Sequence, residues 1–427
     1  MAEIKPFTGW RYSPRVYGQD PGAVTAPPYD VIDEKFQGEL YRRHPHNIIR
    51  LILPREDDRE KGAGDRYESV ALRIRKWREE GVITPDATPR IYLYEQTFRF
   101  GNGPELTRRG FLALIRLEEF ARGEIRPHEK TLSQPREDRL RLLRATRANL
   151  SPVFFCYSDP QGELDFRLRP DDPGVIRFTD EMGVVHSFGF VDRQDLVEKY
   201  VQGISRRKLL IADGHHRYSS ALDHWRENPG ADPEAGYALG FYTRVEDPGL
   251  LILPTHRMIK AVPGFSDREI FVRISSDFDS QPRELPPGVS EGEIADWINR
   301  EIQEGGFTFA LLSAGSPGIN FFRLRPGVDL NSRLAEVPEA VRPIPTAILD
   351  NLVLGKMLGV AREEIGYTSN PLTVIQGLRE GKYQNVFIPR SVSPAEVLQV
   401  VEKGEICPPK TTFFYPKLRS GLVMRIF

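Results

Sequence analysis

The chain has 427 residues, of which 40% are hydrophobic and 28% charged, a composition typical of a globular protein with two or three domains. Its formal net charge of −1 lacks the basic excess of a dedicated nucleic-acid-binding protein, so no nucleic-acid partner is expected. Two cysteines, no apolar core of a signal peptide in residues 1–18, and no apolar run of about 20 residues together predict a cytoplasmic protein with no membrane partner.

The first region, residues 1–105, is expected to be an N-terminal α/β region. Prolines in the segment Ala26-Pro27-Pro28-Tyr29-Asp30 forbid a helix and favour extended backbone. Hydrophobic periodicity predicts a buried strand, a helix and a β-hairpin around this region: Asn47–Leu53, Arg66–Glu80, and Arg90–Phe100 with Arg109–Leu117.

The second region, residues 106–280, is expected to be the catalytic core. It contains a polar segment without periodicity, Gly123–Gln134, which predicts a loop, and Pro135 is suited to the first turn of the helix that follows. The remaining pattern predicts helices up to Ala148, over Asp192–Ile204 and from Gly214 to Trp225, and strands over Ser151–Ser158, Lys208–Ala212, Tyr237–Arg244 and Leu250–Lys260.

The third region, residues 285–427, is expected to be a C-terminal α/β domain after a proline-rich linker near Asp279–Pro287. Its pattern predicts helices over Gly292–Glu304, Thr346–Leu358, Thr373–Arg379 and Pro394–Glu402, and strands over Phe307–Leu312, Ile319–Leu324 and Asn385–Pro389. The chain is therefore expected to be an α/β protein with mixed sheets.

The segment Asp213-Gly214-His215-His216-Arg217 directly follows an apolar strand and begins a helix. The first N–H groups of a helix lack intrahelical partners and lie at the positive end of its dipole, so phosphate or carboxylate binds there readily. Gly214 allows close backbone approach and Arg217 adds a fixed charge. The alternative is that Asp213 only caps the helix and the histidines bond local carbonyls.

A second polar segment is Pro127-His128-Glu129-Lys130-Thr131. Its glutamate lies between two groups that can keep it ionised and able to act as a general base. The alternative is a solvated charged loop. Arg141, Arg144 and Arg147 follow at three-residue spacing and could hold an anion near this loop, or could simply be solvated.

Weaker candidates for contacts with the substrate lie elsewhere, among them Lys410 and Lys417, which could pair with phosphate; each is more often structural than functional. They are residues of polar type beside apolar or aromatic segments: Asp30, Arg50, His256, Arg257, Lys410 and Lys417. Signatures of P-loop ATPases, Rossmann dehydrogenases and α/β-hydrolases do not occur in the sequence, which disfavours all three classes.

The chain resembles the domain-of-unknown-function 1015 family over essentially its whole length. Five segments in matching order carry the resemblance: Ala26–Asp30, Pro127–Thr131, Ala212–Arg217, Leu253–Arg257 and Pro408–Lys417. The Pro-His-Glu loop, followed by a helix, a strand and the Asp-Gly-His-His-Arg turn, also resembles the core of ParB/sulfiredoxin-like free serine kinases. About 80 residues separate the two motifs here, a longer gap than in the compact kinases.

The second resemblance implies a role for each motif residue. Glu129 would be the catalytic base on a serine hydroxyl, with Asp213 and His215 as further catalytic residues and Asp213 orienting Mg²⁺ or the substrate. Nucleotide phosphates would be bound by the other members of the two motifs and the helix between them: His128, Lys130, Thr131, Gly214, His216, Arg217 and Arg144.

The implied function is phosphoryl transfer between a nucleotide, ADP or ATP, and a small-molecule substrate, serine or phosphoserine. Two alternatives remain open at this point: a phosphoserine phosphatase, in which water replaces the nucleotide, and a nucleotide-binding regulatory protein of the ParB-like group.

Overall fold

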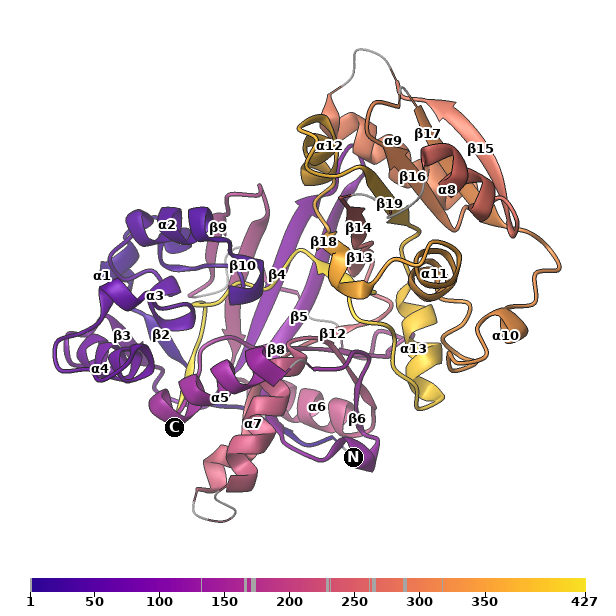
Figure 1. The fold of residues 1–427 in the computed structure, drawn as a ribbon. Helices are drawn as coiled ribbons and strands as arrows, with labels where there is room; N and C mark the ends of the chain where they lie inside the picture. The colour runs from indigo at the N-terminus through magenta and orange to yellow at the C-terminus, as the bar shows by residue number, and fades with distance from the viewer. Residues whose placement is uncertain are drawn as a thin grey trace. The chain divides into compact units, whose positions relative to one another are not determined.

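The computed structural model describes residues 2–427 apart from 132, 165–166, 170–173, 228–229, 231, 261, 263–265, 287–289 and 317. The chain divides into two compact units. Unit 1 consists of Met1–Phe98, Glu105–Leu250 and Pro416–Phe427, and unit 2 of Arg99–Pro104 and Leu251–Tyr415. Each unit combines helices with β-sheet, which confirms the predicted mixed α/β class (Figure 1).

The unit boundaries differ from the three regions expected from the sequence, 1–105, 106–280 and 285–427. Residues of the expected first and second regions share one sheet, because the strand Ile91–Arg99 pairs with the strand Val185–Val191, on the other side of residue 105. The last residues of the chain also return to unit 1. A separate catalytic core at 106–280 therefore stays a prediction.

Unit 1 contains most of the elements expected in the first 250 residues. Its strands are β1 (Ile4–Lys5), β2 (Trp10–Tyr12), β3 (Ile83–Pro85), β4 (Ile91–Arg99), β5 (Glu105–Arg116), β6 (Ile125–Pro127), β7 (Ala148–Asn149), β8 (Val153–Tyr157), β9 (Ile176–Thr179), β10 (Val185–Val191), β11 (Leu209–Asp213), β12 (Tyr237–Arg244) and β21 (Arg425–Ile426). Its α-helices are α1 (Pro14–Tyr17), α2 (Glu34–Arg43), α3 (Ile49–Ile52), α4 (Arg66–Glu79), α5 (Ser133–Thr146), α6 (Gln194–Ser205) and α7 (His215–Glu227).

The main sheet of unit 1 has the order β6-β11-β8-β12-β5-β4-β10-β9, with β1 paired to β5. Strand β11 is parallel to β6, with Leu209 opposite Ile125 and Ile211 opposite Pro127, and antiparallel to β8. Because parallel strands end at the same edge of a sheet, this register brings the residues after Pro127 close to the end of β11. The expected loop over Gly123–Gln134 is wrong at this point, since β6 lies within it.

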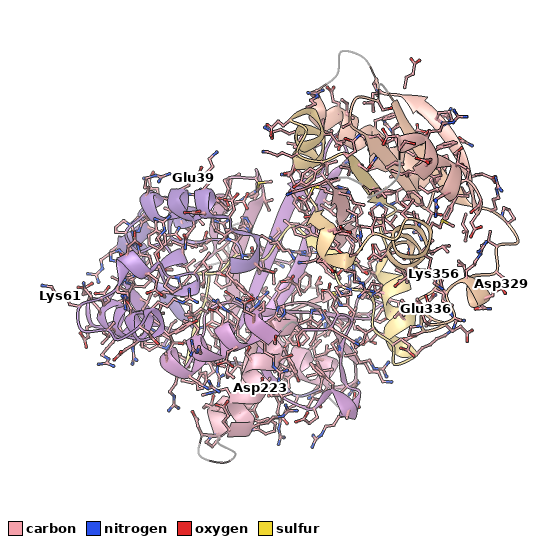
Figure 2. The ribbon with its side chains drawn as sticks, in the orientation of Figure 1. Glu39, Lys61, Asp223, Asp329, Glu336 and Lys356 are labelled. Carbon is pink, nitrogen blue, oxygen red and sulfur yellow. The ribbon has the colours of Figure 1, made fainter. Side chains whose placement is uncertain are left out.

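Helices α5 and α7 pack against each other beside this sheet (Figure 1). Arg136 of α5 donates two hydrogen bonds to Asp223 of α7, which is labelled in Figure 2. The apolar side of α7 contributes Tyr218, Ala221 and Leu222 to the buried core of the sheet. The start of α7 is therefore held in place by packing along its length.

The predicted strand over Asn47–Leu53 is wrong, because Ile49–Ile52 forms the short helix α3. Asn47 is fully buried, and its amide donates to the carbonyls of Ala23 and Thr25 while its oxygen accepts from the N–H of Ile49. A polar side chain that satisfies the first helical N–H favours a helix start over a strand.

Unit 2 has a six-stranded sheet of order β15-β17-β16-β19-β14-β18 and a two-stranded sheet β13-β20. Its strands are β13 (Leu251–Leu253), β14 (His256–Ile259), β15 (Phe278–Glu284), β16 (Phe309–Ser313), β17 (Gly318–Leu324), β18 (Ile365–Thr368), β19 (Asn385–Pro389) and β20 (Phe413–Tyr415). Its helices are α8 (Asp267–Ile274), α9 (Glu291–Glu304), α10 (Leu330–Arg333), α11 (Pro345–Ala347), the π-helix η6 (Ile348–Met357), α12 (Pro371–Arg379) and α13 (Pro394–Glu402).

Three predictions for unit 2 are corrected by these elements. The expected linker near Asp279–Pro287 contains strand β15, whose Pro282 is tolerated because β15 lies at the edge of the sheet. The single strand expected over Leu250–Lys260 is interrupted at Pro254 and becomes β13 and β14, in different sheets. The helix expected over Thr346–Leu358 is largely a π-helix.

Candidate functional site

The turn between β11 and α7 has the geometry expected from its sequence. Gly214 has a φ angle of +88°, a conformation that residues with a Cβ atom rarely adopt. A Cβ atom at this position would also lie 2.9 Å from Cζ of Arg217. Glycine therefore allows both the sharp turn and the position of the Arg217 guanidinium across it.

Asp213, at the end of β11, is held between two cations. Arg217 donates to its Oδ2 at 2.6 Å and Lys417 to its Oδ1 at 2.7 Å. Burial opposes ionisation of this carboxyl group, but the charges of Lys417 and Arg217 outweigh it and hold the pKa of Asp213 well below its usual value. Arg217 also donates to the carbonyl of Pro152, so both ends of its guanidinium are fixed.

The two motifs meet at a contact between two histidines. The backbone N–H of His128 donates to Nε2 of His215 at 3.3 Å, and the two rings lie edge to face with centroids 4.7 Å apart. His128 is fully buried, and its Nδ1 lies 2.7 Å from the carbonyl oxygen of Ile211 in β11. The Pro-His-Glu loop and the Asp-Gly-His-His-Arg turn are thus side by side.

These contacts define the protonation of both rings. A carbonyl only accepts, so Nδ1 of His128 carries its proton; Nε2 of His215 accepts, so its proton is on Nδ1. Burial lowers the pKa of His128 and lowers the pKa of His215 well below its usual value, the latter further reduced by the neighbouring His128. Both rings are therefore neutral near pH 7, and Nδ1 of His215 is a hydrogen-bond donor.

The other residues of the two motifs adjoin these histidines in the sequence and differ in burial. Glu129 is half-buried. Burial lowers the pKa of His128, and the negative charge of Glu129 partly opposes this effect. His216 is half-buried in the first turn of α7. In the Pro-His-Glu loop Thr131 is half-buried and Lys130 exposed.

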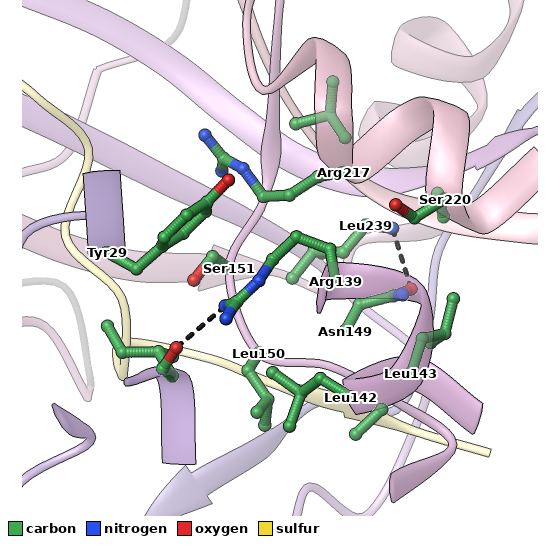
Figure 3. A pocket seen from close by; sticks show the side chains of 14 residues that line it. Tyr29, Arg139, Leu142, Leu143, Asn149, Leu150, Ser151, Arg217, Ser220 and Leu239 are labelled. Atoms are coloured by element: carbon green, nitrogen blue, oxygen red, sulfur yellow. Dashed lines mark hydrogen bonds between the residues drawn. The ribbon is translucent and has the colours of Figure 1, made fainter. Parts of the chain in front are cut away.

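A small cavity of about 60 Å³ adjoins Arg217 in unit 1. Arg217, Tyr29 and Arg139 contribute to its polar side, and the guanidinium of Arg139 lies over the ring of Tyr29 at 4.0 Å (Figure 3). Burial raises the pKa of Tyr29 to about 12, so its hydroxyl stays protonated. Neither Tyr29 nor Arg139 was among the residues predicted for the site, although Tyr29 lies in the segment Ala26–Asp30 that carries the family resemblance.

Three predicted residues of unit 1 have other contacts. Arg50 pairs with Asp58 at 2.6 Å and bonds the carbonyl of Tyr41. Arg144 is exposed and forms a two-point contact with Glu227, which joins α5 to α7. Asp30 is exposed. Arg50, a weak candidate for the substrate site, and Arg144, a predicted phosphate-binding residue, are thus both paired with carboxylates, and their predicted roles stay predictions.

Three further candidates belong to unit 2. Arg257 is fully buried and bonds both oxygens of Asp350 at 2.8 Å, while its Nη1 lies 3.3 Å from the carbonyl oxygen of Lys410. The Lys410 side chain is exposed. His256 is buried, with no hydrogen-bond partner at Nδ1. These contacts make His256 and Arg257 part of the packing of unit 2.

The buried side chain of His256 is expected to make the folded protein less stable in acid. Burial, with Arg257 beside it, lowers the pKa of His256 to about 3, so the unfolded chain binds its proton near pH 6.5 and the folded chain does not. Stability from this group is present above pH 6.5 and falls as the pH drops toward 3. Between pH 7 and 4.5 the loss is expected to be about 2–3 kcal/mol. Urea unfolding of the wild type and His256→Gln at both pH values checks this, since the variant should lose less stability on acidification; an equal loss contradicts it.

The site does not fit a resident Mg²⁺ ion. No group of three or more histidine, cysteine, aspartate or glutamate side chains suited to a metal occurs in the part of the chain that the structure describes. Both oxygens of Asp213, the residue expected to hold magnesium, are engaged by cations. Magnesium would therefore enter this site only as a companion of a nucleotide substrate. Within the described residues, no helix has the length and apolarity of a membrane span.

Solved structures and known families give the following similarities. A conserved hypothetical protein from Pyrococcus furiosus is 15% identical over 69% of this chain and 89% of its own, with a TM-score of 0.33. A free serine kinase in complex with AMP is 14% identical over 68% and 84%, with a TM-score of 0.32. SbnI from Staphylococcus aureus is 11% identical over 72% and 84%, with a TM-score of 0.32.

The comparison with curated proteins gives no match. A family model described as "Protein of unknown function (DUF1015)" matches residues 4–333, most of the chain, and confirms the predicted family. The chain belongs to the DUF1015 family.

Proposed function

We propose that this protein transfers a phosphoryl group between a nucleotide and the hydroxyl group of a small amino acid, with free serine as the first candidate. The observation that carries the proposal is the contact between His128 and His215, which brings the loop of Glu129 next to the glycine turn that begins α7. A base and a phosphate-binding helix start are the two parts that such a reaction needs from a protein.

Each part has a defined role in the proposed reaction. The serine Oγ attacks the terminal phosphorus of the nucleotide, the new O–P bond forms, and the bond to the leaving phosphate oxygen breaks. Glu129 takes the proton from Oγ, and Arg217, the N–H groups at the start of α7 and Nδ1–H of His215 stabilise the charge on the transferred group. Asp213 is a positioning residue, because it holds Arg217 at 2.6 Å.

The direct test is product formation. Purified protein is incubated with serine, Mg²⁺ and either ADP or ATP, and phosphoserine is measured by mass spectrometry; the reverse reaction starts from phosphoserine and AMP or ADP. No product with either nucleotide in either direction contradicts the proposal. Phosphate release from phosphoserine without nucleotide would instead support the phosphatase alternative, and nucleotide binding without turnover would support the regulatory one.

Glu129→Gln is expected to lower the rate of phosphoserine formation about 100-fold or more, because the amide cannot accept the hydroxyl proton. Thermal unfolding should change little, since Glu129 is only half-buried. The matched control is Glu119→Gln, which removes an exposed carboxylate that pairs with Arg226 in the same unit. Equal rates for the two variants would exclude Glu129 as the base.

A further inference from the structure

The last part of the chain reaches the candidate site from a distant part of the sequence. Pro416–Phe427 belongs to unit 1, although the preceding residues from Leu251 to Tyr415 belong to unit 2. Backbone bridges join Ser420 to Ala26 and Met424 to Trp10. The segment Pro416–Phe427, here called the tail, is therefore fixed on the C-terminal side of Lys417.

Buried side chains also hold the tail at Lys417 and at the residues on both sides of it. The carbonyl of Lys417 accepts from the Gln96 amide at 2.9 Å, and the carbonyl of Pro416 accepts from Arg108, which is fully buried. The side chain of Arg419 bonds Thr25 and pairs with Glu181 at 2.6 Å. The backbone of Lys417 is thus pre-positioned by partners in β4, in β5 and near the N-terminus.

Two cations share one carboxylate at the turn between β11 and α7. Lys417 and Arg217 share the single carboxylate of Asp213, and each of these three side chains is less than one-fifth exposed. Burial lowers the pKa of Arg108, and acidic neighbours that include Asp247 and Asp213 partly oppose this effect. Both histidines of the contact are neutral near pH 7. The remaining acidic group of the two motifs is Glu129, which acts on His128.

Two partly buried cations that share one carboxylate favour an added anion, because a buried charge is unfavourable unless it is balanced. We propose that Lys417 is a phosphate-binding residue, supplied to the site by the tail, whose ammonium group passes from Asp213 to a phosphate oxygen when ligand binds. The ligand class is a phosphate ester or anhydride. This inference rests on the proposed function and deepens it, since it adds a binding residue far from both sequence motifs.

The probe is pyrophosphate, which presents phosphate groups without a nucleobase or an amino acid. Its dissociation constant is measured by calorimetry for the wild type, Lys417→Met and Lys417→Arg. A charge-assisted hydrogen bond contributes about 1.5–3 kcal/mol, so Lys417→Met should weaken binding about 10- to 100-fold, and Lys417→Arg should restore most of it. A purely structural lysine would not show recovery of affinity by arginine at equal thermal stability.

The control is Lys5→Met, which removes a lysine with an ion pair of the same length, 2.7 Å to Glu234, in the same unit. Its pyrophosphate affinity should equal that of the wild type. Titrations with ADP and with phosphoserine then identify the source of the phosphate, since only the ligand that uses Lys417 will lose affinity in Lys417→Met. Unchanged pyrophosphate binding in Lys417→Met, or none in the wild type, overturns the inference. If phosphoserine forms with unchanged KM in Lys417→Met, the inference fails and the proposed function stands.

Discussion

Asp213→Asn is expected to lower the free energy of unfolding by about 3 kcal/mol and, at the same time, to tighten pyrophosphate binding. The carboxylate balances Arg217 and Lys417, and removal of one partner of a buried ion pair leaves the other charges uncompensated. A phosphate group can take the place of the lost carboxylate, so the variant should recover stability when ligand is added. The rate of phosphoryl transfer should nevertheless fall, because Arg217 loses its positioning partner.

The measurements are urea unfolding with and without pyrophosphate, and calorimetric titration of the same ligand. Asp223→Asn is a closely matched control, because Asp223 also lies between two arginines, Arg136 and Arg226, but near the other end of α7 (Figure 2). It should lose stability without a gain in anion affinity. Weaker pyrophosphate binding in Asp213→Asn would contradict the explanation, since it would mean that the carboxylate supports the ligand rather than replacing it.

The corner between β11 and α7 could be predicted because its signals are local. An apolar run, a glycine and a polar helix start are adjacent in the sequence, and the observed φ of Gly214 is what such a turn requires. The nearness of His128 to His215 came from resemblance alone. No local pattern reveals it, because it depends on β6, three residues whose strand character arises only from pairing with β11.

Non-local contacts also explain the other differences between the predicted elements and the observed structure. The Asn47 amide donates to the carbonyls of Ala23 and Thr25, 24 and 22 residues away, and its oxygen accepts from the N–H of Ile49 at the start of α3. Its segment, which has the composition of a strand, is therefore helical. The ion pair between Lys417 and Asp213 spans 204 residues, and only the return of the tail to unit 1 makes it possible. Periodicity reports which face of an element is apolar, but it carries no information on which distant polar groups will meet.

Asp350→Asn is expected to destabilise unit 2 by about 3–5 kcal/mol, the cost of leaving a buried charge without its partner. Arg257 has no exposed surface, and Asp350 accepts from both its Nε and its Nη2 at 2.8 Å. Asparagine would remove the negative charge and present an NH₂ group to the guanidinium at one of these positions. The candidate site lies in unit 1 and should stay intact in this variant. Its affinity for pyrophosphate should therefore be unchanged at temperatures where the protein is folded.

Hydrogen exchange measured on peptides separates the two units. In Asp350→Asn, peptides covering β14 and β18 should exchange faster, while those covering β11 and β12 should not change. Asp279→Asn is the control, because it breaks an ion pair of similar length, 2.9 Å to Arg325, on the surface of unit 2, where the expected loss is below about 1 kcal/mol.

A double variant, Arg257→Met with Asp350→Leu, removes both charges and should lose less stability than Asp350→Asn alone, because no charge is then left buried. Equal losses in the single and double variants would show that packing around Arg257, and not its charge, stabilises unit 2.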